Sequence, residues 1–105
     1  MINLDGKWLD LIKEILKKHV PNCEVRAFGS RANGQAKQHS DLDLVIIGKE
    51  KLDWKHLESL KSAFSESNLP IMVDVIDWHT IPESFQNFIN KKYDVIQDTY
   101  RTASS

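Results

Sequence analysis

Two aspartates separated by a single residue, Asp41 and Asp43, are side chains whose type and spacing could carry chemistry. On a β-strand, residues two positions apart point to the same face, and the rise of the strand places them about 7 Å apart along the backbone. Two carboxylates held in this way repel each other unless a cation lies between them. Mg²⁺ prefers oxygen ligands and often links one or two carboxylates to substrate phosphate oxygens. The pair therefore indicates a metal site for a phosphate-bearing substrate, although an exposed polar strand end would show the same spacing.

A glycine followed by a serine, Gly29-Ser30, stands at the end of the preceding predicted strand. Glycine permits close approach of the backbone, and a short helical turn after it can present free amide groups to phosphate. On its own such a pair is most often only a turn. Together with the two aspartates, it predicts that a phosphate-binding loop and a metal site converge.

A third aspartate, Asp74, interrupts an apolar segment that contains Val73 and Val75. An unpaired carboxylate facing a core would be costly, so this side chain needs a cation or water. If its strand lies beside that of Asp41, the three carboxylates form one cluster, in which Asp74 helps to bind metal, lowers the pKa of an acceptor hydroxyl and could serve as its general base. A strand with one solvated face is the alternative. Asp77, three residues further on, would point to the opposite face and is excluded from the cluster.

The loop between these motifs supplies weaker candidates. Arg31 could neutralise phosphate charge, but an arginine after a turn is as often a solvated surface residue. Ser40 could orient Asp41 or cap the start of its strand. Lys37 and His39 could make contacts from this loop, but a polar loop contains such residues in any case.

Three predicted strands position the candidate residues. They cover Cys23–Phe28, Asp41–Ile47 and Ile71–Asp77, and a polar loop over residues 31–40 joins the first two. The apolar run at the end of the second strand indicates that it is central in the sheet. The loop is long for a hairpin, which is typical of a functional segment.

Helical patterns alternate with these strands. Apolar residues recur at helical spacing from Leu4 until Pro21 prevents continuation. A second helix contains Trp54, Leu57, Leu60 and Phe64, and Asp53 is placed to accept hydrogen bonds from its first amides. Thr80 and Glu83 match a capping box that opens a third helix. We expect a mixed α/β or α+β fold with the helices on one side of a small sheet.

Size and composition limit the protein further. With 105 residues, 41% of them hydrophobic and 28% charged, the chain fits one folded domain over residues 1–105, with 98–105 as a loose tail. The net charge of −1 gives no indication of nucleic-acid binding. No apolar stretch approaches the roughly 18 residues that span a membrane. Cys23 is the only cysteine, so we expect a reducing, cytoplasmic setting.

Gly29-Ser30, ten intervening residues and then Asp41-Leu42-Asp43 resemble the signature of the minimal nucleotidyltransferases (MNT) of the polymerase-beta superfamily. The similarity extends over residues 28–34, 40–44 and 73–77 and suits the predicted order of elements, a polymerase-beta-like nucleotidyltransferase fold. It implies that Asp41, Asp43 and Asp74 bind two divalent metal ions, Mg²⁺ or alternatively Mn²⁺, and that Gly29 and Ser30 hold the triphosphate. The sequence departs from the family pattern at none of these positions.

The resemblance also implies a reaction and a partner. An acceptor hydroxyl would attack the α-phosphorus of a nucleoside triphosphate, expected to be ATP, so that AMP is transferred and pyrophosphate leaves. Small members of the family often pair with a separately encoded helical protein of the HEPN type, so a hetero-oligomer or homo-oligomer is possible. The alternative is an antitoxin or binding subunit that masks its partner without catalysis. A small α/β domain with no catalytic role remains a third reading.

Overall fold

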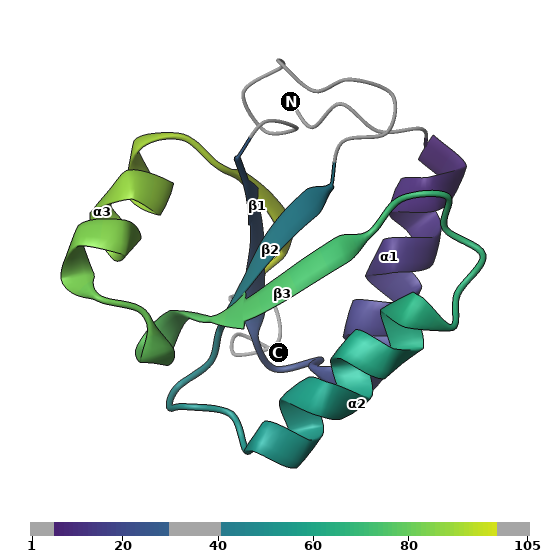
Figure 1. Cartoon of the computed structure of the whole chain (residues 1–105), viewed down its shortest axis with the longest axis horizontal. Helices are drawn as coiled ribbons and strands as arrows, with labels where there is room; N and C mark the ends of the chain where they lie inside the picture. The colour runs from purple at the N-terminus through teal and green to yellow at the C-terminus, as the bar shows by residue number, and fades with distance from the viewer. Residues whose placement is uncertain (1–5, 30–40, 99–105) are drawn as a thin grey trace.

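The computed structural model describes residues 6–29 and 41–98, which build one mixed sheet with helices on both faces (Figure 1). The elements follow in the order α1 (Gly6–His19), β1 (Glu24–Phe28), β2 (Leu42–Ile47), α2 (Trp54–Ser65), β3 (Val73–Asp77), the 3₁₀ helix η1 (Trp78–Thr80), α3 (Glu83–Lys91) and β4 (Asp94–Gln97). The three predicted strands and three predicted helices are all present. Within the described ranges, no helix is long and apolar enough to cross a membrane.

The strand β2 lies inside the sheet, as its apolar sequence predicted. The strand order is β3-β2-β1-β4, with β2 parallel to β3 and antiparallel to β1, and β1 antiparallel to β4. Leu42, Leu44 and Ile46 are fully buried on one face of β2, and Val45 is fully buried on the other. A strand that is apolar on both faces needs a covered sheet on both sides.

Helices accordingly cover both faces, and the expectation that all of them lie on one side is wrong. On one face, α1 and α2 contribute Ile12 and Leu60 to the larger core. On the other face, Ile89 of α3 packs in a second core with Phe28 and Val45. Figure 1 shows α3 across the sheet from α1 and α2. A single helical layer would leave this second apolar face in water, at a cost of about 1.5–3 kcal/mol for each large side chain.

The short strand β4 was missed by the sequence analysis. It has only four residues, and two of them are polar, so its pattern is too short to indicate a strand. It forms because the edge of β1 offers unpaired backbone groups to it. The side-chain amide of Gln97 donates to the backbone oxygens of Val20 and Cys23 at 2.6 and 2.9 Å. These hydrogen bonds fix β4 beside the end of α1.

Both predicted helix caps differ from the structure. Asp53 is the N-cap residue of α2, but its side chain makes no capping hydrogen bond. Pro82, rather than Thr80, is the N-cap of α3, so the capping box is wrong. Thr80 lies in η1 instead, where its hydroxyl donates to the backbone oxygen of Asp77 at 2.8 Å. The intervening Pro82 has an extended backbone, which places the start of α3 later than the sequence spacing suggested.

Asp77 is a buried carboxylate at the end of β3, only 2% exposed. It accepts hydrogen bonds from the backbone amides of Leu52, at 2.7 Å, and His79, at 2.9 Å. It therefore joins the segment before α2 to the start of η1. Asp77 is the N-cap residue of η1, so it starts the next turn, as the sequence predicted. Its register partner is Ile46, which packs against α1 and α2, so Asp77 points away from the face of Asp74.

We expect Asp77→Ala to lower the free energy of unfolding by about 2–4 kcal/mol, because two backbone donors lose their acceptor inside the protein. Urea denaturation followed by circular dichroism measures the loss. Asp53→Ala is the matched control and should change stability by no more than about 0.5 kcal/mol, because that exposed carboxylate makes no capping bond. Equal effects of the two substitutions would contradict the anchoring role of Asp77.

Candidate active site

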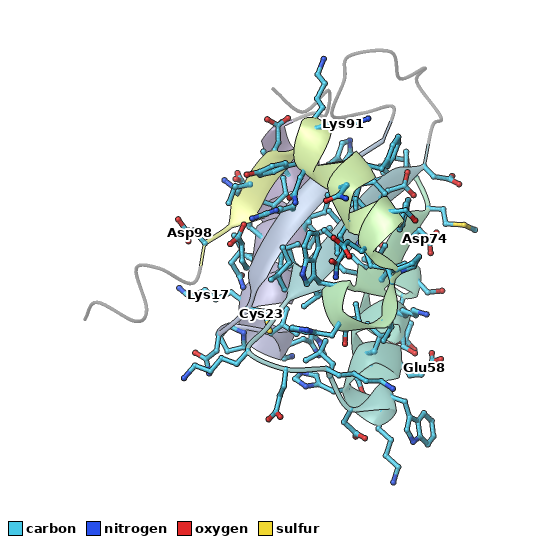
Figure 2. The ribbon with its side chains drawn as sticks, turned by 90° about the vertical axis from the view of Figure 1, so that its left-hand side faces the viewer. Lys17, Cys23, Glu58, Asp74, Lys91 and Asp98 are labelled. Atoms are coloured by element: carbon cyan, nitrogen blue, oxygen red, sulfur yellow. The ribbon has the colours of Figure 1, made fainter. Side chains whose placement is uncertain are left out.

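Asp43 and Asp74 stand side by side on neighbouring parallel strands. They are direct register partners in the pairing of β2 with β3, so their side chains leave the same face of the sheet on strands about 4.8 Å apart. The backbone amide of Leu42 donates to the oxygen of Met72 at 2.9 Å, which extends this pairing to the end of the strands. Figure 2 labels Asp74 above the level of Cys23, toward the upper end of the sheet. The condition on which the three-carboxylate cluster depended, that the two strands are adjacent, is therefore met.

The electrostatics of this end of the sheet centre on Asp43. Asp43 is half-buried, whereas Asp41 and Asp74 are exposed. Burial raises the pKa of the Asp43 carboxyl, and the negative charges of Asp74 and then Asp41 raise it further. The three carboxylates thus form one electrostatic group, and a bound cation would relieve the repulsion within it.

Gly29 directly follows β1, close to Asp43. Its φ of +82° lies in the left-handed region that favours glycine. A Cβ at this position would lie 2.6 Å from Oδ2 of Asp43, too close for any side chain without a shift of the carboxylate. Glycine at this position therefore leaves room for the Asp43 carboxylate, and its predicted contact with phosphate stays a prediction. Ser30, Arg31, Lys37, His39 and Ser40 lie outside the described residues, and their roles stay predictions.

The oxygen donors suit a hard divalent cation, but they are not yet arranged around one. Among residues 6–29 and 41–98, no three His, Cys, Asp or Glu side chains stand in an arrangement that could hold a metal ion. The backbone register nevertheless fixes Asp43 next to Asp74, and the exposed side chains of Asp41 and Asp74 can rotate. Carboxylate oxygens are the ligands that Mg²⁺ and Mn²⁺ favour. The residues therefore fit such an ion in chemistry, while its final coordination requires side-chain movement.

Arg26 was not singled out by the sequence, yet it fixes α3 on the face that carries Asp43. Its guanidinium lies 4.2 Å from the ring centroid of Tyr93 and 5.6 Å from that of Trp78. It also donates to Asn90 Oδ1 at 2.8 Å and pairs with Glu24. The only local signal is the alternation of Glu24, Arg26 and a phenylalanine on one face of β1. No pattern in the sequence connects Arg26 with residues more than sixty positions away.

A groove lies at the other end of the sheet. It has a volume of about 660 Å³ and is lined by residues 22–24, where β1 begins, and 47–53, where β2 ends. Burial, and then the charge of Asp77, raises the pKa of the Cys23 thiol in its wall, which disfavours the nucleophilic thiolate. None of the predicted site residues lines this groove.

A family model described as polymerase beta nucleotidyltransferase matches residues 10–101. The chain belongs to this family. It is 48% identical over 101 residues to the "Probable protein adenylyltransferase MntA" of Haemophilus influenzae, a match that covers 96% of this chain and 89% of that protein. The sequence resemblance to the polymerase-beta nucleotidyltransferases is confirmed, and the protein is a nucleotidyltransferase.

Solved structures of the nucleotidyltransferase fold agree with this assignment. A chain of a toxin–antitoxin complex with AMP-PNP matches with a TM-score of 0.66 and 20% identity, over 90% of this chain and 76% of that one. A chain of the Shewanella oneidensis complex between a tri-AMPylated HEPN toxin and its MNT antitoxin matches with a TM-score of 0.58 and 17% identity, over 91% and 77%. At these identities the comparison concerns the fold, which is the polymerase-beta-like α/β architecture predicted from the sequence.

Proposed function

We propose that this nucleotidyltransferase transfers AMP from ATP to a hydroxyl group on a separately encoded HEPN-type protein. The observation that carries the proposal is the pairing of Asp43 with Asp74 directly beside Gly29, because it assembles carboxylates from separate parts of the chain at one end of the sheet. Two comparisons support the donor and the acceptor. The Haemophilus relative is named a protein adenylyltransferase, and a structure with the same fold contains an AMPylated HEPN toxin.

Each residue of the site has a proposed role. Asp41, Asp43 and Asp74 would hold two Mg²⁺ ions, with Mn²⁺ as a substitute, and Gly29 with Ser30 and Arg31 would bind the triphosphate, next to Ser40. The metal ions supply charge neutralisation when bound. Asp74 is exposed at the start of β3, where an acceptor can reach it, so it is suited to accept the hydroxyl proton.

The transfer itself is a single displacement. The acceptor oxygen forms a bond to the α-phosphorus while the bond to the leaving pyrophosphate breaks, and Asp74 takes the proton that the hydroxyl loses. The chain contributes mainly position and charge, which lets a small domain carry out the reaction when another surface holds the acceptor. The need for ATP and the single reduced cysteine favour a cytoplasmic site of action.

The proposal is tested by incubating the purified chain and its HEPN-type partner with Mg²⁺ and each of the four nucleoside triphosphates, labelled at the α-phosphate. We expect label on the partner with ATP. An Asp41→Asn, Asp43→Asn double variant that still binds the partner should transfer none. Absence of label with every nucleotide, or full labelling by the double variant, would contradict the proposal.

The second candidate is an antitoxin that neutralises its partner by covering it. Structures of toxin–antitoxin complexes with the same fold favour this candidate. The double variant separates the two functions in a toxicity assay in cells. Loss of neutralisation with partner binding intact would favour chemistry, whereas retained neutralisation would favour masking.

A further inference from the structure

Three phenylalanine rings form a row that leads from the neighbour of Asp43 to solvent. Phe28 is buried and is the register partner of Asp43 across β1 and β2. Phe85 of α3 meets it edge to face, with ring centroids 5.7 Å apart. Phe88 lies against Phe85 with centroids 5.8 Å apart and an angle of 8° between the planes. Phe88 ends the row and is 54% exposed.

The position of Phe88 along the sheet follows from the end of α3. The helix ends at Lys91, and Asp94 then pairs with Ala27, next to Phe28 and Gly29. The last turn of α3 therefore lies at the same end of the sheet as Asp43. In Figure 2, α3 lies in front of the sheet, with Lys91 at its upper end and Asp74 to one side.

The side of α3 on which Phe88 lies follows from helix geometry. Successive helical residues are about 100° apart, so Phe88 and Asn90 flank the fully buried Ile89 on opposite sides. Asn90 faces β1, because it accepts a hydrogen bond from Arg26. Phe88 is consequently turned the other way, toward β2 and β3. At this end of the sheet, those strands carry Asp43 and Asp74.

We propose that Phe88 is the stacking surface for the base of the bound nucleoside triphosphate. The inference rests on the proposed function, because it requires the triphosphate to lie near Gly29 and the carboxylates. Aromatic side chains bind bases through their π-faces, and Phe88 is already held parallel to Phe85, so little rotational freedom remains to be lost on binding. Its exposed half gives the base a place to contact.

Phe88 is one of four exposed large apolar side chains among the described residues. The other three are Trp54, Met72 and Val95. Trp54 is the other exposed aromatic, but it lies at the first turn of α2, on the opposite face of the sheet from α3. Stacking is tolerant of base identity because every base has a π-face. Phe88 should therefore increase the affinity for a nucleotide without selecting ATP over GTP.

The test compares the binding of Mg²⁺-ATP and Mg²⁺-tripolyphosphate to the full chain by titration calorimetry. Phe88→Ala should raise the Kd for ATP about tenfold, within the range measured for base stacking on aromatic side chains. The same substitution should leave tripolyphosphate binding unchanged, because that ligand has no base. Phe88→Trp, which keeps an aromatic ring at this position, should bind ATP as tightly as the wild-type protein does. The matched control Trp54→Ala should change neither Kd.

Three outcomes would overturn the inference. They are an unchanged ATP affinity in Phe88→Ala, an equal loss for both ligands, and a loss of HEPN-partner binding with ATP affinity intact, which would make Phe88 a protein contact. The Asp43→Asn variant distinguishes failure of the proposed function. If it binds Mg²⁺-ATP as wild type does while Phe88→Ala does not, the proposed metal site is wrong and the stacking surface stands.

Discussion

Replacing Asp43 by asparagine is expected to slow AMP transfer about a hundredfold to a thousandfold while making the metal-free protein more stable. The loss of activity follows because the substitution removes a charged oxygen donor from the centre of the carboxylate group, and single preorganised groups of this kind contribute about 10²–10³ in rate. The gain in stability follows because asparagine keeps the shape of the side chain but removes a negative charge that faces Asp74 and Asp41.

The pH dependence gives this prediction a definite sign. The folded protein raises the pKa of Asp43 above the value of the unfolded chain. The folded state therefore holds the Asp43 proton more tightly, and this residue lowers stability as the pH rises through the unfolded and then the folded pKa. The advantage of Asp43→Asn should be fully present at neutral pH, at roughly 0.2–1 kcal/mol as for like charges on paired strands, and absent below the unfolded pKa.

Thermal unfolding at pH 7 and at low pH, with and without Mg²⁺, measures both effects. Mg²⁺ should stabilise the wild-type protein more than the variant, because a ligand that binds the folded state stabilises it more when it binds more tightly. Asp10→Asn, which changes an exposed carboxylate on α1, should alter neither transfer nor the response to Mg²⁺. A metal-free Asp43→Asn protein less stable than wild type at pH 7 would show that the Asp43 carboxylate stabilises the fold.

Gly29→Ala is expected to lower the free energy of unfolding by about 1–3 kcal/mol and to reduce transfer about a hundredfold. A backbone with φ of +82° is strained for any residue with a Cβ, at a cost of about 1–2 kcal/mol. The new methyl group would also meet Asp43 Oδ2 at 2.6 Å, so the carboxylate must move or β1 must shift. A displacement of this size in a catalytic group is enough to cost about 10² in rate.

Gly6→Ala provides the control for this substitution, because a Cβ on Gly6 would meet nothing within 4 Å. It should leave transfer unchanged and keep or slightly raise stability. Chemical denaturation and the rate of label transfer to the partner are measured for both variants. Full activity in a folded Gly29→Ala protein would contradict the idea that this glycine sets the position of Asp43.

Much of the candidate site could be predicted from the sequence because its signals are local. The alternation of side chains along a strand separated Asp77 from Asp74, and the structure agrees for β3. The same alternation predicted that Asp41 and Asp43 share a face, and Asp41 lies immediately before β2. The apolar segment of β2 indicated its central position because burial on both faces leaves no room for polar residues. These inferences depend on neighbours in sequence, so no tertiary information was needed.

Other features depend on contacts between distant segments. The strand β4 forms on the edge of β1, and the extended Pro82 moves the start of α3 away from the expected capping box. The row from Phe28 to Phe88 and the contacts of Arg26 join residues that are far apart in sequence. Local propensity has no information about which partner such a segment will meet.

The sequence by itself determined which residues could do chemistry, because residue type and strand periodicity depend only on neighbouring positions in the chain. Only the tertiary structure decided that Asp74 lies next to Asp43 and that a side chain at Gly29 would collide with the same carboxylate. Both facts follow from the pairing of β2 with β3 and with β1, and such pairing is selected by burial of apolar side chains over the whole sheet.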